Sequence, residues 1–401
     1  MSKQLIPSSI TGDGTSFAAG GSVLDHNFGA GEPYTLGVEE EYMLLDGETL
    51  DLVQHVEAVL AAAEGHELEE QVNPELMQSV LEIATPVCRT PAEVDAELRR
   101  LRTYVTGLAT ERGMRVGSAG THPFSLFERQ RITARDRYRH LVDQLQYIAR
   151  RELIFGLHIH VAVDDPERAI KVVNGLLTHL SSLLALSASS PFWRGELTGL
   201  ESSRQMVFAA FPRSGPPPRF RDYADYAEVV GQLEKTGCIA DYTHIWWDIR
   251  LHPRFGTVEI RVCDAVTQVE DAVALAAFCQ ALVKLYCERH AVGAEIPSYH
   301  RILTTENKWL AARYGLEAPV MDLANGRRNR VPVAQLVRRT LKEIEPHARE
   351  LGSDRELEGI REILARGNGS DRQRRVWNAN RDIVEVVREI ADATERAAVP
   401  A

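Results

Sequence analysis

The sequence of 401 residues lacks the glycine-rich motifs that most often bind nucleotides. No G-x-G-x-x-G opens a helix after a predicted strand, and no G-x-x-x-x-G-K-[ST] occurs, so neither a Rossmann fold nor a P-loop is expected. A long apolar run is missing as well. The most apolar stretch, 176–186, includes a threonine, a histidine and two serines. It is too short and too polar to cross a membrane and is predicted to be a buried helix.

Paired cysteines and excess positive charge are also absent. The five cysteines form no C-x-x-C pair and show no zinc-binding spacing with histidine. An odd number of cysteines without a signal sequence is typical of reduced thiols in a cytoplasmic protein. The net charge of −11 argues against nucleic acid or an anionic membrane as the main partner, because both are negatively charged.

Strands and helices are predicted to alternate irregularly along the chain. Residues 1–33 are rich in glycine and serine and are predicted to form a flexible arm. No regular β-α-β order follows, and 243–251 with 256–262 is predicted to form a hairpin. The chain is predicted to be almost entirely helical after residue 269, with loops near 325–330 and 367–370. This organisation indicates an α+β protein with an antiparallel or mixed sheet.

Hydrophobic periodicity places the earlier elements. The remaining predicted strands are 34–45, 80–85, 115–119 and 155–163. The predicted helices are 56–63, 91–112, 135–153 and 166–187, and 190–221 is predicted to be a loop. The second helix has a clear start, because Thr90 can cap it, Pro91 takes its first position and Glu93 completes a capping box.

Several predicted strands carry ionisable side chains at alternate positions. Because strand side chains alternate between faces, Glu39 and Glu41 share a face, and Glu40 points the other way. The same spacing pairs His158 with His160, Asp248 with Arg250, and Glu259 with Arg261. Glu82 stands alone in an apolar strand. An exposed sheet face also alternates in this way, and for any single strand that explanation is equally good.

The combined set of strands favours a binding site. A solvated face usually mixes lysine, threonine, serine and glutamine, whereas these positions hold carboxylate, imidazole and guanidinium groups. Carboxylates gathered on one face repel each other unless a cation lies between them. If Glu39, Glu41, Glu82 and Glu259 share a concave face, the natural occupant is Mg²⁺, because carboxylates and phosphate oxygens together complete its coordination shell.

Motifs along the chain resemble the carboxylate–amine ligases related to glutamate–cysteine ligase, which share a glutamine synthetase-like fold. In order, the resemblance rests on Thr-Leu-Gly-Val-Glu-Glu-Glu-Tyr at 35–42, Leu-Glu-Ile-Ala-Thr-Pro at 81–86 and Gly-Leu-His-Ile-His-Val at 156–161. It continues with Phe-Gly-Thr-Val-Glu-Ile-Arg-Val at 255–262, Glu-Asn-Lys-Trp-Leu-Ala-Ala-Arg-Tyr-Gly at 306–315 and Gly-Asn-Gly-Ser-Asp-Arg-Gln at 367–373. One short motif would be weak, but the ordered set is specific.

The resemblance implies one catalytic domain over 34–401 with a helical C-terminal part. Its core would be a six-stranded antiparallel sheet curved into a funnel, with helices on the outer face. By position, the implied metal ligands are Glu39, Glu41, Glu75, Glu82, His158 and Glu259. The implied catalytic residues are Arg261, Arg204 and Arg250, and the implied nucleotide-binding residues are His158, His160, Arg261, Arg313 and Arg372.

The resemblance further implies a two-step reaction that uses ATP with Mg²⁺, or Mn²⁺ in its place. A carboxylate attacks the γ-phosphorus of ATP, and an amine then attacks the resulting acyl phosphate to form an amide. Glutamate is the implied acid and cysteine one implied amine, in a homodimer whose partners are small molecules. Two alternatives stay open: phosphoryl transfer to a guanidino group on the same fold, and an inactive protein that binds ATP and metal as a regulator.

Overall fold

The computed structural model describes residues 25–297, 299–323 and 329–396, and within them seven strands form one antiparallel sheet. The order across the sheet is β10-β11-β5-β1-β3-β2, and β4 also pairs with β1. The strands are β1 (Leu36–Asp46), β2 (Val72–Pro74), β3 (Val80–Ala84), β4 (Met114–Gly117), β5 (Gly156–Ala162), β10 (Ile249–His252) and β11 (Thr257–Asp264). The predicted α+β class is confirmed.

The sheet has seven strands instead of the expected six because its central strand is long. The first half of β1 pairs with β5 through residues 36–40, and its last residues, 43–46, pair with β4 on the same side. The opposite side of β1 pairs with β3. Two short strands therefore share one edge of β1, and the sheet remains six strands wide.

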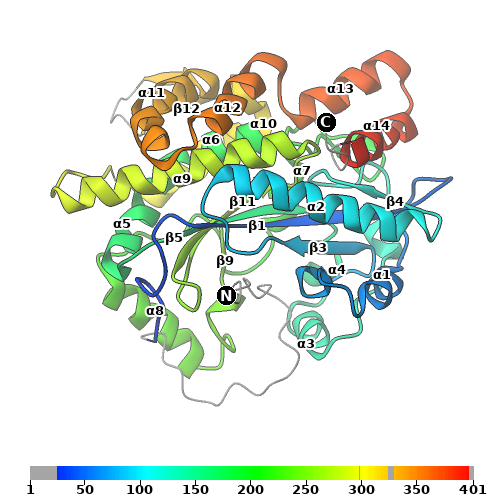
Figure 1. The fold of residues 1–401 in the computed structure, drawn as a ribbon, viewed down its shortest axis with the longest axis horizontal. Coiled ribbons are helices and arrows are strands. Elements are labelled where there is room, and N and C mark those ends of the chain that lie inside the picture. The colour runs from blue at the N-terminus through cyan, green and yellow to red at the C-terminus, as the bar shows by residue number, and fades with distance from the viewer. Residues whose placement is uncertain (1–24, 298, 324–328, 397–401) are drawn as a thin grey trace.

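Helices pack against one face of this sheet. The helices α2 (Pro91–Thr110), α5 (Pro166–Leu176), α6 (Leu180–Ser187) and α9 (Val269–Ala291) form a single apolar core with the strands. Figure 1 shows α2 and α9 across the sheet, with α11 (Val333–Leu351), α12 (Asp354–Arg366), α13 (Gly369–Asn380) and α14 (Ile383–Arg396) beyond them. As predicted, Thr90 caps α2, and its side chain accepts from the Glu93 amide at 3.2 Å.

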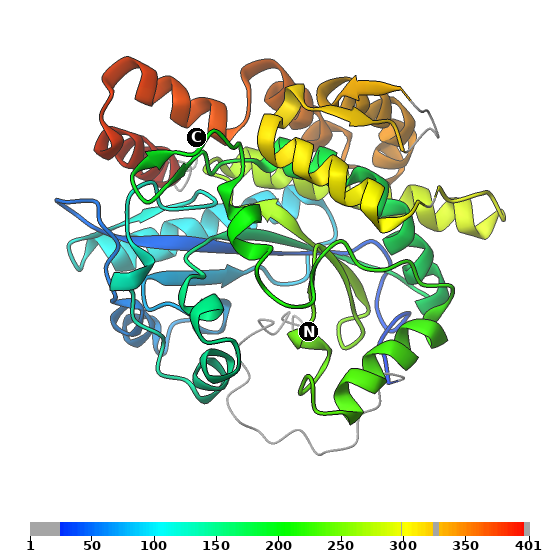
Figure 2. The same cartoon turned by 180° about the vertical axis from the view of Figure 1, so that it is seen from behind.

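The other face of the sheet is overlain by irregular chain. Figure 2 shows the segment around 190–245 in front of the sheet, including α7 (Ser203–Phe208), and α8 (Tyr223–Lys235) beside it. The predicted loop 190–221 is therefore not fully irregular, because it contains α7 and three two-residue strands: β6 (Phe192–Trp193), β7 (Glu196–Leu197) and β8 (Ser214–Gly215). The helix α8 was not predicted. Likewise, the predicted strand 243–251 is interrupted, because β9 (Trp246–Trp247) ends before β10 begins.

Two predicted helices are divided in the structure. Gln146 has a φ of 51°, which ends α3 (Asp136–Leu145) before α4 (Tyr147–Arg150) begins. A short 3-10 turn, Leu177–His179, separates α5 from α6. Together, α5 and α6 are long and apolar enough to span a membrane, but 94% of the apolar window is buried inside the protein, so they serve as core helices. The helix α1 (Val56–Ala63) matches its prediction, and α10 (Arg301–Tyr314) lies in the predicted helical part.

Part of the predicted flexible arm is docked on the domain. Phe28 is buried, the Asn27 amide donates to Pro253 O at 2.9 Å, and the Gly29 amide donates to Val163 O at 3.3 Å. Residues 1–24 of the arm, and most of the loop predicted near 325–330, lie outside the described residues. That loop joins β12 (Pro319–Met321) to β13 (Arg330–Pro332), a small hairpin that was not predicted. The described residues contain no disulfide between the five cysteines.

Glu40 points to the helical face of the sheet, as alternation predicts, but it is buried in an ion pair. The Arg102 guanidinium of α2 donates from Nη2 to Glu40 Oε1 at 2.6 Å and from Nε to Oε2 at 2.9 Å. Arg102 and Glu40 are each only 1% exposed. Tyr42 donates its hydroxyl to the same carboxylate. Glu40 therefore fixes α2 to the central strand.

We expect Glu40→Gln to lower the free energy of unfolding by about 3–5 kcal/mol, because it leaves the buried Arg102 charge without its anion. Urea denaturation of the variant and the wild type measures this loss. Glu48→Gln, in the exposed turn after β1, is the control and should leave stability within about 0.5 kcal/mol of the wild type. Equal stability of Glu40→Gln and Glu48→Gln would contradict the prediction.

Candidate active site

The face of the sheet away from α2 carries the ionisable side chains that alternation grouped together. The strand register sets Glu39 opposite His158, Glu41 opposite Glu82, and Glu259 opposite His160. Directly opposed residues in antiparallel strands point to the same face with their Cβ atoms close together. These side chains therefore form a continuous row across β3, β1, β5 and β11, which we call the carboxylate row.

Three overlapping groups in the carboxylate row have the spacing of metal ligands. In each group the candidate ligand atoms lie within 4.8 Å of one another. The first group is Glu39, His160 and Glu259, the second Glu39, Glu82 and His158, and the third Glu41, Glu75 and Glu82. Glu75 reaches the row from the loop between β2 and β3. The structure thus brings all six predicted metal ligands together and adds His160 to them.

Glu39 is held ionised by two histidines. Its Oε2 lies 3.1 Å from His158 Nδ1, and its Oε1 lies 3.6 Å from His160 Nε2. Burial acts to raise the pKa of Glu39, but the hydrogen bonds and charges of the two histidines outweigh it and hold the pKa well below its ordinary value. Burial, followed by the charge of Arg261, lowers the pKa of His158, although the hydrogen bond with Glu39 and the charge of Glu41 act to raise it.

Glu82 has the opposite environment. Both of its carboxylate oxygens are buried and accept no hydrogen bond within the described residues. Burial, followed by the charges of Glu39, Glu75 and Glu41, raises its pKa well above the ordinary value. Burial and the charge of Glu41 raise the pKa of Glu75 to about 8. A buried carboxylate without a donor is costly, and a divalent cation between these oxygens removes that cost, so the donor set fits a hard cation such as Mg²⁺.

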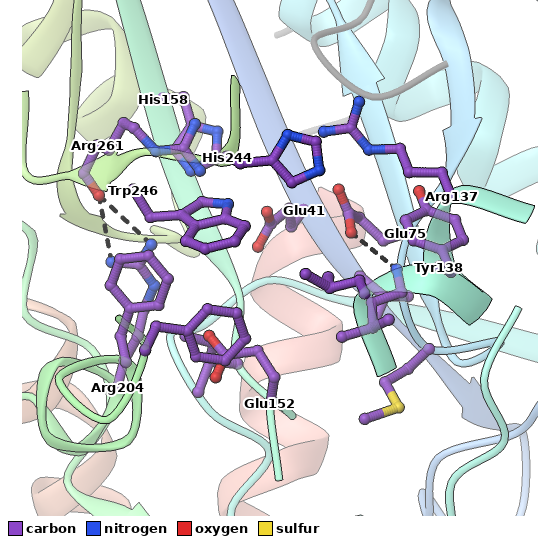
Figure 3. A pocket seen from close by; sticks show the side chains of 17 residues that line it. Glu41, Glu75, Arg137, Tyr138, Glu152, His158, Arg204, His244, Trp246 and Arg261 are labelled. Atoms are coloured by element: carbon purple, nitrogen blue, oxygen red, sulfur yellow. Dashed lines mark hydrogen bonds between the residues drawn. The ribbon is translucent and has the colours of Figure 1, made fainter. Parts of the chain in front are cut away.

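One end of the carboxylate row opens into a cavity, shown in Figure 3. Glu41 lies at its centre, Glu75 and Tyr138 line one side, and Arg204 lies on the other. Arg261 reaches the cavity from β11, where the register shifts between Ile260 and Cys263. Such a bulge redirects side chains, and here Arg261 donates to Glu259 while it lines the cavity.

The guanidinium of the cavity residue Arg204 makes only long contacts with other protein groups. It is buried, and its two terminal nitrogens donate to Arg261 O only at 3.5 and 3.4 Å, while its Nη1 lies 3.9 Å from Asp264 Oδ1. Its Nε has no hydrogen-bond partner within the described residues. The guanidinium is therefore available to an anionic ligand in the cavity.

The structure does not bring Arg250 to the cavity. Its Nε and Nη2 bind Glu259 Oε2 at 2.8 and 2.7 Å, and its Nη1 donates to the carbonyls of Thr243 and Ile245. These bonds occupy the guanidinium, so Arg250 holds Glu259 in place. The charges of Arg250 and Arg261 hold the pKa of Glu259 well below its ordinary value, although burial acts to raise it.

Arg313 and Arg372 also lie away from the cavity. Arg313 donates to Gly199 O and stacks on Tyr314. Arg372, on α13, is partly buried near Asp271 and Arg366, and burial lowers its pKa. The sequence placed both arginines by motif alone, and the helices that carry them turn their side chains toward other contacts.

The cavity also contains residues that the sequence analysis did not select. They are Arg137 and Tyr138 of α3, Glu152 after α4, His244, and Trp246 of β9. Trp246 lies two positions before Asp248 in a predicted strand, so the alternation that placed Asp248 on the site face could also have placed Trp246 there. His244 lies in the same predicted strand with the same alternate spacing. The others come from a predicted amphipathic helix, where no periodic pattern distinguishes a cavity residue from a surface residue.

Comparisons with known proteins agree with the fold and the motifs. A sequence model of the family described as glutamate-cysteine ligase family 2 matches residues 35–393. The chain is 44% identical to a Rubrobacter xylanophilus protein named "Putative glutamate--cysteine ligase 2-1", over 91% of this chain and 96% of that protein. It is also 44% identical to a Sorangium cellulosum protein named "Putative glutamate--cysteine ligase 2", over 90% and 96% of the two chains.

Two solved structures share the fold. A glutamate–cysteine ligase from Francisella tularensis matches with a TM-score of 0.65 and 12% identity, over 91% of this chain and 89% of that chain. A bifunctional glutathione synthetase from Pasteurella multocida matches with a TM-score of 0.65 and 15% identity, over 91% of this chain and 53% of that chain. Together with the family match, these similarities confirm the resemblance and the glutamine synthetase-like fold. The chain therefore belongs to glutamate–cysteine ligase family 2, and it is a ligase of the carboxylate–amine type.

Proposed function

We propose that this ligase uses ATP and Mg²⁺ to join a carboxylate to an amine through an acyl phosphate, with release of ADP and phosphate. The observation that carries the proposal is the carboxylate row. In it Glu82 is buried beside Glu39, Glu41 and Glu75, and neither of its oxygens accepts a hydrogen bond from the described part of the chain. Such a row fits cations that bind phosphate oxygens, and it opens into a cavity lined by arginines.

In this proposal Glu39, Glu41, Glu75, Glu82, Glu259 and His158 hold Mg²⁺, or Mn²⁺ in its place, and His160 lies beside them. The bound cation neutralises phosphate oxygens during phosphoryl transfer. Arg261 faces the transferring phosphoryl group and stabilises its charge, because Glu259 fixes its guanidinium at the cavity wall. Arg204 holds the substrate carboxylate with the donors that the protein leaves unused.

Glutamate is the proposed acid and cysteine one proposed amine. The names of the relatives support this pair, and the Francisella tularensis enzyme was solved in complex with AMP, which supports use of an adenine nucleotide. The described residues that line the cavity include no group that would select a thiol, so the test must include amines other than cysteine. The cytoplasmic location and the homodimer stay predictions.

The test is a screen of ADP release over pairs of amino acids, with Mg²⁺ and with Mn²⁺, followed by mass analysis of the product. The proposal expects ADP release that needs both an acid and an amine, and an amide as the product. A stable phosphorylated guanidino compound would instead identify a phosphotransferase. Binding of ATP and Mg²⁺ without ADP release for any pair would identify an inactive regulator.

A further inference from the structure

The cavity contains one carboxylate that the three metal-ligand groups do not include. Glu152 lies between α4 and β5 and lines the cavity together with Glu41, Arg204 and Arg261. Its Oε2 is buried, and its carboxylate accepts no hydrogen bond and forms no ion pair within the described residues. A carboxylate in this position does not stabilise the fold, because burial removes its hydration and nothing in the protein replaces it.

The surroundings of Glu152 suit a group that gains and loses a proton. Figure 3 shows its side chain beside Arg204, on the opposite side of the cavity from Arg137. Burial raises the pKa of Glu152 to about 8, and the charge of Glu41 adds to this effect. Arg204 of α7 and the adjacent Arg151 act in the opposite direction, and Glu75 adds a weaker negative charge from the β2–β3 loop. A carboxylate with a raised pKa is a stronger base than an exposed one.

We propose that Glu152 is the catalytic base that accepts the proton of the incoming amine; this role rests on the proposed ligase reaction. An amine arrives as an ammonium ion, which has no lone pair with which to attack. Glu152 takes one proton from its nitrogen and becomes a neutral carboxylic acid. The freed lone pair attacks the carbonyl carbon of the acyl phosphate, the C–N bond forms, and the C–O bond to phosphate breaks. The second nitrogen proton leaves to the departing phosphate or to water.

The position of Glu152 also suits the approach of a cation. An ammonium ion beside Glu152 satisfies the unpaired Oε2 and lowers the pKa of the carboxyl, so the carboxylate is ionised when the amine arrives. Apart from the proposed metal ligands, His244 is the other described group on the cavity wall that can accept a proton. Its Nδ1 lies 3.6 Å from Asp241 Oδ1, and in Figure 3 it lies beside Arg137, away from Arg204. Glu152 is therefore nearer to Arg204, the arginine proposed to hold the substrate carboxylate.

Two amines that differ in their need for a base test this role. With L-glutamate, ATP and Mg²⁺, the purified full-length protein is given either L-cysteine or hydroxylamine. Cysteine must lose a proton before it attacks, whereas hydroxylamine is largely uncharged at neutral pH and attacks an acyl phosphate directly. Glu152→Gln is expected to lower peptide formation by about 100-fold or more and to keep hydroxamate formation within a few-fold of the wild type.

Two further variants complete the test. Glu152→Asp retains a carboxylate and should recover part of the peptide formation. Glu228→Gln changes an exposed glutamate on α8 and should leave both products unchanged. Equal loss of both products in Glu152→Gln, or loss of neither, would overturn the role of Glu152 while the wild type stays active. A wild-type protein that forms neither product would overturn the proposed function, and the role of Glu152 with it.

Discussion

Glu82→Gln is expected to reduce the affinity of the protein for Mg²⁺ by about 100-fold. Loss of a residue that only supports a metal ligand already costs up to about 100-fold in affinity. Glutamine has the same size as glutamate but lacks the charge that two of the three ligand groups share through Glu82. The Mg²⁺-dependent rise in unfolding temperature measures the effect. At a concentration 100 times the dissociation constant, a bound ion stabilises the wild type by about 2.7 kcal/mol, and most of this gain should be absent from the variant.

In EDTA the order of stability should reverse. Without metal, burial beside other carboxylates disfavours the ionised form that Glu82 has in the unfolded state, which costs folding free energy, so Glu82→Gln should unfold at a higher temperature than the wild type at pH 8. Glu40→Gln is the matched control, because it changes a glutamate on the opposite face of the same sheet: it should lose stability and keep its response to Mg²⁺. An unchanged Mg²⁺ response in Glu82→Gln would show that this carboxylate is not a ligand.

In the metal-free protein the buried carboxyls Glu75 and Glu82 should contribute to the pH dependence of stability with a definite sign. Burial and Glu41 raise the pKa of Glu75 from 4.5 to about 8, and the pKa of Glu82 is also raised. Between about 4.5 and about 8 the folded state holds protons on these carboxyls that the unfolded state has released, so their contribution to stability falls as the pH rises through this range. In Glu82→Gln this contribution should be smaller, since one of the raised carboxyls is gone, and bound Mg²⁺ should reduce it in the wild type.

Arg261→Ala is expected to lower the rate of ADP release by about 100- to 1,000-fold, the usual effect of removing one preorganised donor from a developing charge. The fold should survive, because Arg250 still pairs with Glu259 through two bonds. Steady-state ADP release, with the far-ultraviolet circular dichroism spectrum as the check on folding, measures the effect. The loss should appear mainly in kcat, because the guanidinium acts on the transferring group.

Two variants frame this result. Arg221→Ala removes an exposed arginine before α8 and should leave ADP release unchanged. Arg261→Lys keeps a positive charge but cannot contact Glu259 and a phosphoryl group in the same planar arrangement, so it should recover only part of the rate. Near-normal turnover in folded Arg261→Ala would remove Arg261 from the reaction.

Local sequence was sufficient for the grouping of Glu39 with Glu41 and of His158 with His160. An extended backbone alternates its side chains whatever the rest of the chain does, so the face of each residue follows from its position in the strand. For the same reason the opposite direction of Glu40 was predictable. Its burial against Arg102 was not, because that contact joins residues 62 positions apart.

The sequence by itself determined which side chains share a face, the α+β class and, through its ordered motifs, the family. Only the tertiary structure decided which of those side chains meet. Strand register sets Glu41 opposite Glu82, a loop brings Glu75 to them, and Arg250 is taken up by Glu259. It also placed Glu152 in the cavity, from the end of a predicted helix whose periodicity does not separate cavity residues from surface residues. The physical reason is that a residue's face is a local property of the backbone, whereas the distance between two strands or loops depends on how the whole chain packs.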